Sequence, residues 1–239
     1  MQTEVKPTFN VRPAVTTIEV DGVVYNAQPI AGNWHQVRDG DYTEGFRQGI
    51  MRAQVNLVHS GYVNKGSDDK LTKESAGKIV KVARNKWVTG NTALYGGNSG
   101  NEWVFAQDLP EVKEGRIVMN QDELVARIEA EGKRIVNDYL HISADGQVRA
   151  MKRKGFRSGE YTIEQMLASN QPTLITGDEQ APRKIADMME IAKKPGYLSI
   201  PSQGIITVPD LDGGGGRVYL LGGNWGEFNG NGRSFGVRR

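Results

Sequence analysis

The sequence contains no cysteine, which excludes a disulfide framework, a thiolate metal site and a cysteine nucleophile. It also lacks any apolar run near the ~20 residues that cross a membrane, and residues 1–13 lack the apolar core of a secretory signal. We therefore expect synthesis in a cytoplasm without export by a signal peptide. That expectation is compatible with a viral protein carried on a virion, or with association with a cell surface.

Charge of one sign and histidine are also scarce. The 30 Lys and Arg residues nearly balance the 28 Asp and Glu residues, so composition alone indicates no nucleic-acid or membrane partner. His35, His59 and His141 are far apart and show no metal-ligand spacing. The acidic pairs at 68–69 and 210–212 offer carboxylates to a cation, although such pairs are more often solvated turns. We expect neither a metal nor another cofactor.

The order of elements favours an α+β protein with one domain over residues 1–239. Two β-branched runs flank Asp21-Gly22, which predicts a hairpin with a type I′ turn. Apolar periodicity and capping residues predict helices over 43–60, 72–84, 121–136, 162–165 and 182–194. Further strands are predicted at 103–105, 204–208, 218–221 and 235–238. Because helices occupy the middle and strands both ends, we expect the hairpin to neighbour the C-terminal strand.

The C-terminal segment 212–239 is the most unusual part of the chain. Ten of its residues are glycine, and large aromatic side chains stand between them: Tyr219, Trp225, Phe228 and Phe235. A permissive backbone carrying aromatic and Asn side chains is typical of a binding surface built from loops. The alternative is a disordered tail, which the strand-like pieces at both ends argue against. For Tyr219 and Phe235, strand alternation leaves core packing as an equal alternative.

This segment resembles the closing motif of one branch of the C-type lectin fold. Leu221-Gly-Gly-Asn-Trp225, followed by Phe235-Gly-Val-Arg238, is similar to the end of formylglycine-generating enzymes. Ala93-Leu-Tyr95 and Gly100-Asn-Glu-Trp103 are similar to an upstream motif of the same branch. Within this fold, the closing segment is the variable region of proteins diversified by diversity-generating retroelements. The resemblance covers 218–239 well, 93–103 loosely and 106–200 not at all.

The resemblance implies a C-type lectin fold, with small antiparallel sheets formed by N- and C-terminal strands and helices from the middle of the chain. The enzymes of this branch need a catalytic cysteine, so we expect no enzyme. The lectins of this fold that bind sugar through Ca²⁺ need several carboxylates, and the segment offers only Asp212 and Glu227. What remains is a non-catalytic protein that displays a hypervariable C-terminal surface to a protein or cell-surface ligand.

The resemblance also implies which residues make that surface. Retroelement mutagenesis acts at adenines, and Asn codons begin with two adenines, which points to the three Asn residues of the segment. The candidate ligand-binding residues are Tyr219, Asn224, Trp225, Glu227, Phe228, Asn229, Asn231, Arg233 and Ser234. The expected scaffold residues are Gly222, Gly223 and Gly236.

Two other functions stay open at this stage. An invariant structural or adhesion module related to the formylglycine-generating enzymes would have the same fold with a constant C-terminus. The basic stretch 149–157 suggests nucleic-acid binding, with Phe156 stacking on a base. Such a charge run is more often a solvated face, so we expect no nucleic-acid partner. Its cations are Arg149, Lys152, Arg153, Lys154 and Arg157.

Overall fold

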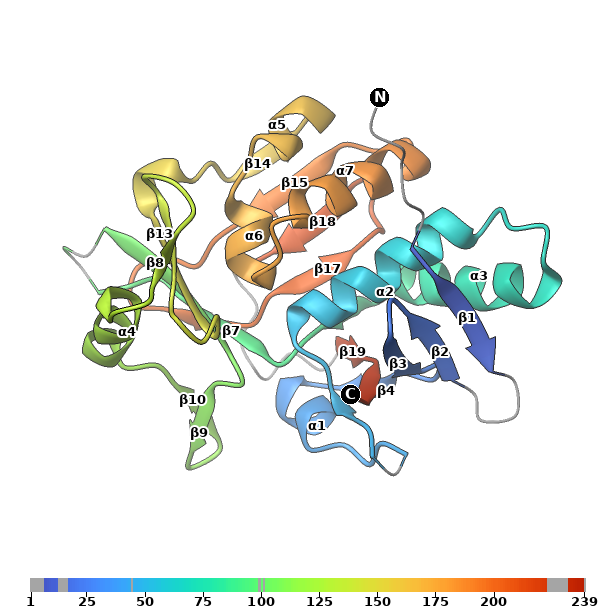
Figure 1. Ribbon diagram of the computed structural model, residues 1–239, viewed down its shortest axis with the longest axis horizontal. Helices are drawn as coiled ribbons and strands as arrows, with labels where there is room; N and C mark the ends of the chain where they lie inside the picture. Colours follow the sequence, from blue (N-terminus) through green and yellow to red (C-terminus); the bar gives the residue numbers. More distant parts are fainter. Residues whose placement is uncertain are drawn as a thin grey trace.

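The N-terminal hairpin and the C-terminal strand share one sheet, as the sequence predicts. The computed structural model (Figure 1) describes residues 7–12, 17–43, 45–98, 100, 102–222 and 232–238. Asp21 and Gly22 both have positive φ (49° and 78°), which confirms the type I′ turn. The sheet order is β1-β2-β3-β20-β5, and β20 pairs with β3 of the hairpin. The bounds are β1 Phe9–Arg12, β2 Thr17–Val20, β3 Val23–Asn26, β5 Arg47–Gln48 and β20 Gly236–Arg238.

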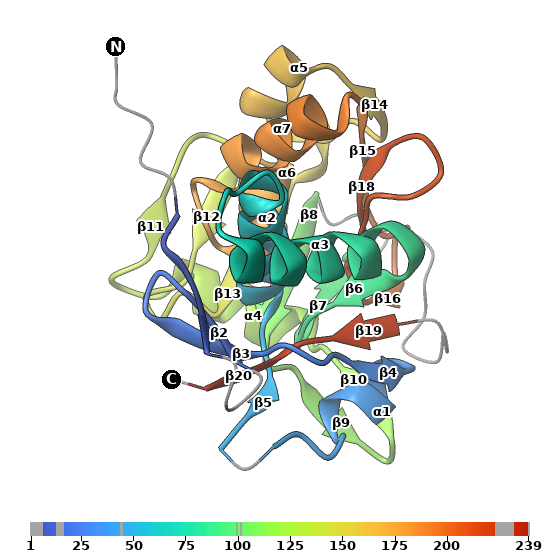
Figure 2. The ribbon, with the colours of Figure 1, turned by 90° about the vertical axis from the view of Figure 1, so that its right-hand side faces the viewer.

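A seven-stranded sheet holds most of the C-terminal segment. Its order is β14-β15-β18-β17-β6-β19-β4, with parallel pairs at β15–β18 and β19–β6. In Figures 1 and 2, β19 and β20 run beside the N-terminal strands β4 and β3. The bounds are β4 Ile30–Gly32, β6 Trp87–Thr89, β14 Gly159–Tyr161, β15 Gly196–Ser199, β17 Asp210–Asp212, β18 Val218–Leu221 and β19 Gly232–Ser234.

A third sheet comes mainly from the middle of the chain, where the sequence had placed chiefly helices. All of its pairs are antiparallel, in the order β11-β12-β13-β8-β7-β16. The bounds are β7 Thr92–Tyr95, β8 Trp103–Asp108, β11 Arg134–Ile135, β12 Leu140–Ile142, β13 Val148–Lys152 and β16 Ile206–Thr207. A separate hairpin is formed by β9 Glu111–Lys113 and β10 Arg116–Val118.

Helix α2 lies between α3 and α7 and also contacts α6 (Figures 1 and 2). The predicted inward face of α3, which contains Ala76, Ile79, Val80 and Ala83, is buried. The capping box that Thr162 and Gln165 predict is present at the start of α5. The bounds are α1 Trp34–Arg38, α2 Met51–Asn64, α3 Lys70–Asn85, α4 Gln121–Glu129, the 3-10 turn Arg153–Gly155, α5 Ile163–Leu167, α6 Gln171–Thr176 and α7 Ala181–Ala192.

Two helix boundaries differ from the prediction for tertiary reasons. The helix predicted over 43–60 begins at Met51, because residues 47–48 pair with β20 instead. Gly61 does not end this helix, and its missing side chain lets Ile79 of α3 pack closely. The helix predicted over 121–136 ends at Glu129, and Ile135 lies in β11 with 57% of its surface exposed.

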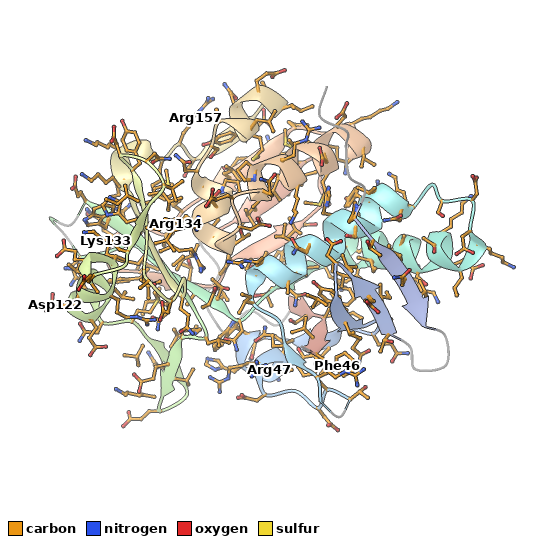
Figure 3. All side chains as sticks on the ribbon, in the orientation of Figure 1. Phe46, Arg47, Asp122, Lys133, Arg134 and Arg157 are labelled. Atoms are coloured by element: carbon orange, nitrogen blue, oxygen red, sulfur yellow. The ribbon has the colours of Figure 1, made fainter. Side chains whose placement is uncertain are left out.

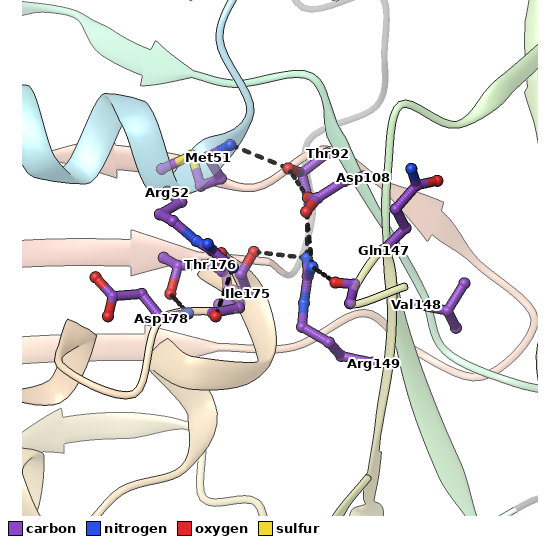
Figure 4. Close-up of polar contacts among 12 residues, drawn as sticks. Met51, Arg52, Thr92, Asp108, Gln147, Val148, Arg149, Ile175, Thr176 and Asp178 are labelled. Carbon is purple, nitrogen blue, oxygen red and sulfur yellow. Dashed lines mark hydrogen bonds and ion pairs between the residues drawn. The ribbon is translucent and has the colours of Figure 1, made fainter. Parts of the chain in front are cut away.

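A fully buried arginine links these layers (Figure 4). The guanidinium of Arg149 on β13 makes two hydrogen bonds to the Asp108 carboxylate on β8, at 2.7 and 3.0 Å. It also donates to the carbonyls of Leu174 and Ile175 in α6. Asp108 in turn accepts a hydrogen bond from the hydroxyl of Thr92 on β7. The pair therefore holds two strands and a helix in one arrangement.

We expect Arg149→Met to lower the free energy of unfolding by about 3–5 kcal/mol, because it leaves a buried carboxylate without its counter-charge. Chemical denaturation of the purified variant measures this loss. The double variant Arg149→Met, Asp108→Leu should recover much of it, because no lone charge is then buried. Equal stability of Arg149→Met and the wild-type protein would contradict a structural role for the pair.

Candidate functional site

The predicted variable segment is described at both of its ends. Residues 212–222 and 232–238 of the segment 212–239 are described, on either side of residues 223–231. The candidate residues between them lie outside the described residues: Gly223, Asn224, Trp225, Glu227, Phe228, Asn229 and Asn231. The structure therefore describes residues 212–222 and 232–238, which form the frame for residues 223–231.

The C-terminal end of the frame is held by a glutamine from α2. The Gln54 side-chain amide donates to the carbonyl of Phe235 (2.9 Å) and accepts from its N–H (3.1 Å). The Phe235 side chain is fully buried in the main core. Of the two roles that the sequence left open for it, contact with a ligand or packing in the core, the structure shows packing in the core. Since Gln54 bonds the backbone, this anchor does not depend on the side chains that precede it.

Two glycines of the frame sit where a side chain would collide. A Cβ on Gly222 would overlap Leu94 and approach the carbonyl oxygen of Ser199 to 3.0 Å. A Cβ on Gly236 would lie 2.5 Å from the ring of Tyr42. The backbone of Gly222 is also fixed, since its N–H donates to the Ser199 carbonyl (3.0 Å) and its carbonyl accepts from Thr207 (2.6 Å). Both positions thus have a steric reason to be glycine.

A row of polar and aromatic side chains crosses four strands of the seven-stranded sheet. Cross-strand pairing aligns Glu160 with Tyr197, Tyr197 with Tyr219, and Tyr219 with Asp212. The Tyr197 and Tyr219 rings are 5.6 Å apart, and both side chains are partly exposed. Arg217 spans the row, with its guanidinium 5.3 Å from the Tyr197 ring centre and hydrogen-bonded to Glu160. Tyr219 therefore lies in a partly exposed aromatic row.

The sequence identified Tyr219 and missed its neighbours. Tyr197 and Glu160 come from other parts of the chain and reach Tyr219 through strand register, whereas Arg217 lies two residues before Tyr219 in the same segment. A signal existed in the alternation of Gly196-Tyr-Leu-Ser199, a strand pattern just after the helix predicted over 182–194, to which the prediction assigned no strand.

Of the other candidate ligand-binding residues, the structure describes Arg233 and Ser234, and their side chains differ in exposure. Arg233 is half-buried and donates to the carbonyl of Gly232. Ser234 has no exposed surface. In this structure its side chain is not available to a ligand, because β19 turns it into the interior before the Phe235 anchor.

The acidic pair at 210–212 forms strand β17, which corrects its assignment to a solvated turn. Asp210 is buried between β6 and β18. Burial, together with the nearby charge of Asp212, raises the pKa of Asp210 to about 8. Burial also raises the pKa of Asp212, against hydrogen bonds from Gly214 and Trp87 that lower it. Asp210 is thus predominantly protonated at neutral pH.

The basic stretch 149–157 does not form one cationic face. Arg149 is buried with Asp108, and Arg153 donates inward to the carbonyl of Gly96. Lys152 pairs with Glu102, at 3.3 Å. Lys154 and Arg157 remain exposed, and Figure 3 shows Arg157 projecting outward beside α5. Phe156 is partly buried against the core, so no stacking platform is offered there.

Two of the histidines contact partners on different elements. His59 hydrogen-bonds Asp187 (3.0 Å), and burial lowers its pKa despite that contact. His141 lies against Trp103. Across the described ranges, no group of three His, Cys, Asp or Glu side chains is arranged to hold a metal ion. None of the helices described has the length and apolar character needed to cross a membrane.

Comparison with known proteins finds one informative similarity. No family model and no curated protein matches the chain. A solved structure is similar to it, from work described as the accommodation of massive sequence variation in Nanoarchaeota by the C-type lectin fold. The TM-score is 0.50 at 15% identity, over 88% of this chain and 98% of the other. The chain therefore has the C-type lectin fold that the closing motif predicts.

Replacing a glycine of the frame by alanine should lower the free energy of unfolding, whereas the same replacement at an open position in a helix should raise it. We expect Gly236→Ala to lower the free energy of unfolding by about 1–3 kcal/mol, because its methyl group overlaps the Tyr42 ring. Gly77→Ala is the control, since this exposed position in α3 has open space and alanine favours a helix by about 0.5–1 kcal/mol. Thermal unfolding should shift in opposite directions for the two variants.

The raised pKa of Asp210 predicts an unusual pH dependence. The unfolded carboxyl titrates near 3.8 and the folded one near 8, so the folded protein holds a proton that the unfolded chain releases. This contribution to stability is full below pH 4 and is lost as the pH rises toward 8. We expect Asp210→Asn to stabilise the protein more at pH 8 than at pH 5, by on the order of 3 kcal/mol. Denaturation at both pH values tests this, with exposed Asp68→Asn as control.

Proposed function

We propose that the protein binds a protein or cell-surface ligand without catalysing a reaction, through variable side chains of its C-terminal segment. A diversity-generating retroelement supplies the variation, and the C-type lectin fold supplies the frame. The segment's composition, aromatic and Asn residues among glycines, suits contact with unrelated ligands. A structurally similar protein is described as accommodating massive sequence variation on this fold, which supports the same use here.

The observation that carries the proposal is the pair of anchors on either side of residues 223–231. Gly222 is held before the segment by backbone and hydroxyl groups of Ser199 and Thr207. Phe235 is held after it by Gln54 and by burial of its ring. Neither anchor, as described, uses a side chain from residues 223–231. Substitutions between the anchors can therefore change the surface while the frame keeps its geometry.

The partly exposed row beside the frame extends this surface. Tyr197 and Tyr219 supply aromatic contact area with few rotatable bonds, which suits an interface. Arg217 is already positioned by Glu160 and by the Tyr197 ring, so little freedom is lost when it contacts a ligand. In this proposal Glu160 and Tyr197, which lie outside the segment, contribute constant contacts, and Tyr219 and residues 223–231 contribute variable ones.

Sequencing the 3′ end of the gene in a natural population tests the proposal directly. We expect codons for residues about 217–235 to vary, with a near-copy of this stretch beside a reverse transcriptase gene that differs only at adenines. An invariant 3′ end without a near-copy would instead favour a constant structural or adhesion module on the same fold.

The display role also predicts how substitutions affect stability. Replacing Trp225, Phe228 and Asn229 together by Ala should leave the melting temperature nearly unchanged, because exposed side chains contribute little to the core. Phe235→Ala is the control, because this buried ring should cost about 3–5 kcal/mol. If the triple variant loses as much stability as the control, these residues belong to the core and are not displayed.

A further inference from the structure

A groove of about 460 Å³ lies beside the outermost strand of the seven-stranded sheet. It is bounded by β14, by the start of α5 and by the C-terminal end of α7. It shares only Glu160 with the row of side chains that extends the proposed display surface. Its lining includes Arg157, Tyr161, Ile163, Met189, Lys194 and Pro195.

The floor of the groove is apolar and firmly packed. Tyr161 and Met189 are buried, and the Tyr161 hydroxyl is held by the carbonyl of Arg157. Ile163 and Pro195 complete the apolar lining. Such a volume accommodates one large apolar side chain, and the buried neighbours keep it from collapsing.

The rim of the groove is positively charged. The Arg157 guanidinium lies 5.6 Å from the Tyr161 ring centre, and its side chain is exposed. Lys194 donates to the carbonyl of Gly213. Among the residues that the structure describes, neither cation is paired with a carboxylate, while the nearby Glu160 is engaged by Arg217. Asp212 lies near Lys194 and partly balances its charge, and Glu160 also lines the groove. The Arg157 guanidinium is therefore the main positive charge that the described residues leave to an acidic ligand.

The neighbouring strand offers an open edge. Within the described ranges β14 pairs only with β15, so alternate N–H and C=O groups of Gly159–Tyr161 face away from the sheet. Gly159 has open space where a side chain would stand, so another backbone can approach it. A free edge beside an apolar pocket is the arrangement that extended peptides use when they add a strand to a sheet.

We propose that this groove and the β14 edge bind an extended acidic segment of a partner protein. The segment adds a strand along residues 159–161 and inserts one apolar side chain between Tyr161, Ile163 and Met189. Acidic side chains next to it face Arg157 and Lys194. This site is fixed in sequence and is built from residues 157–195, so the protein binds two partners through different residues.

Fluorescence anisotropy with defined peptides tests the site. The probes are fluorescein-labelled Glu-Asp-Val-X-Val-Asp-Glu amides, in which X is Phe, Leu, Ile, Met or Tyr. At least one should bind the wild-type protein, and replacing X by Ser, or the acidic residues by Lys, should weaken it by about tenfold or more. N-methylation at alternate peptide residues should abolish binding in one register and spare it in the other, because only alternate N–H groups reach the strand edge.

Protein variants supply the matched control. Arg157→Glu, alone and with Lys194→Glu, should weaken binding by about tenfold or more at unchanged melting temperature. Arg116→Glu makes the same charge change on the β9–β10 hairpin, at the opposite end of the molecule in Figures 1 and 2, and should bind like wild type. The triple Ala variant of Trp225, Phe228 and Asn229 should also bind normally, which separates this site from the display surface.

Three results would overturn the proposal. The first is that no probe binds at about 1 mM. The second is that N-methylation leaves binding intact in both registers, because the strand edge would then be unused. The third is that Arg116→Glu weakens binding as much as Arg157→Glu, because the attraction would then be unspecific charge.

Discussion

The buried ion pair between Arg149 and Asp108 is the interaction on which the geometry of the molecule depends. From it, a chain of hydrogen bonds runs to the C-terminal frame. Asp108 accepts from the Thr92 hydroxyl, which accepts from the first backbone N–H of α2. One turn later, Gln54 of α2 clamps the backbone of Phe235. Because a desolvated charge tolerates few alternative positions, this pair fixes where α2 begins, and α2 fixes where the last strands lie. Such a pair contributes more to a unique arrangement than to net stability.

The residues that hold the frame in place are different from residues 223–231, which lie between its two anchors. The anchors of the C-terminal segment are backbone groups, a buried ring and glycines without room for a side chain. They are contacted from α2, β7, β15 and β16, and by Tyr42 between α1 and β5. A frame held by backbone contacts is insensitive to side-chain changes in the loop that it carries. By contrast, contacts made through loop side chains would break whenever those side chains changed. The physical requirement for a variable surface is therefore met by elements far from it in sequence.

The sequence predicts those parts whose signals are local. Asp21-Gly22 determines its own turn, and the spacing from Ala76 to Ala83 determines the buried face of α3. The fold class followed from the closing motif at 221–238. Features that depend on distant partners were not predictable. Residues 47–48 have helical periodicity but pair with β20, and the pair at 210–212 looks solvated but lies in a central strand. The row from Glu160 to Asp212 exists only through the register of four strands, which no single segment encodes.

The packing at the end of the chain also limits where variation can be accommodated. Ser234 has no exposed surface, and Gly236 leaves no space beside Tyr42, so larger side chains at either position would push into the core. Gly222 is equally confined by Leu94. Variable positions that keep the fold must therefore lie between Gly222 and Ser234, or project outward from β18 as Tyr219 does. This range of variable positions is narrower than the Gly-rich composition suggests. Composition shows where the backbone is permissive, whereas packing decides which side chains have room.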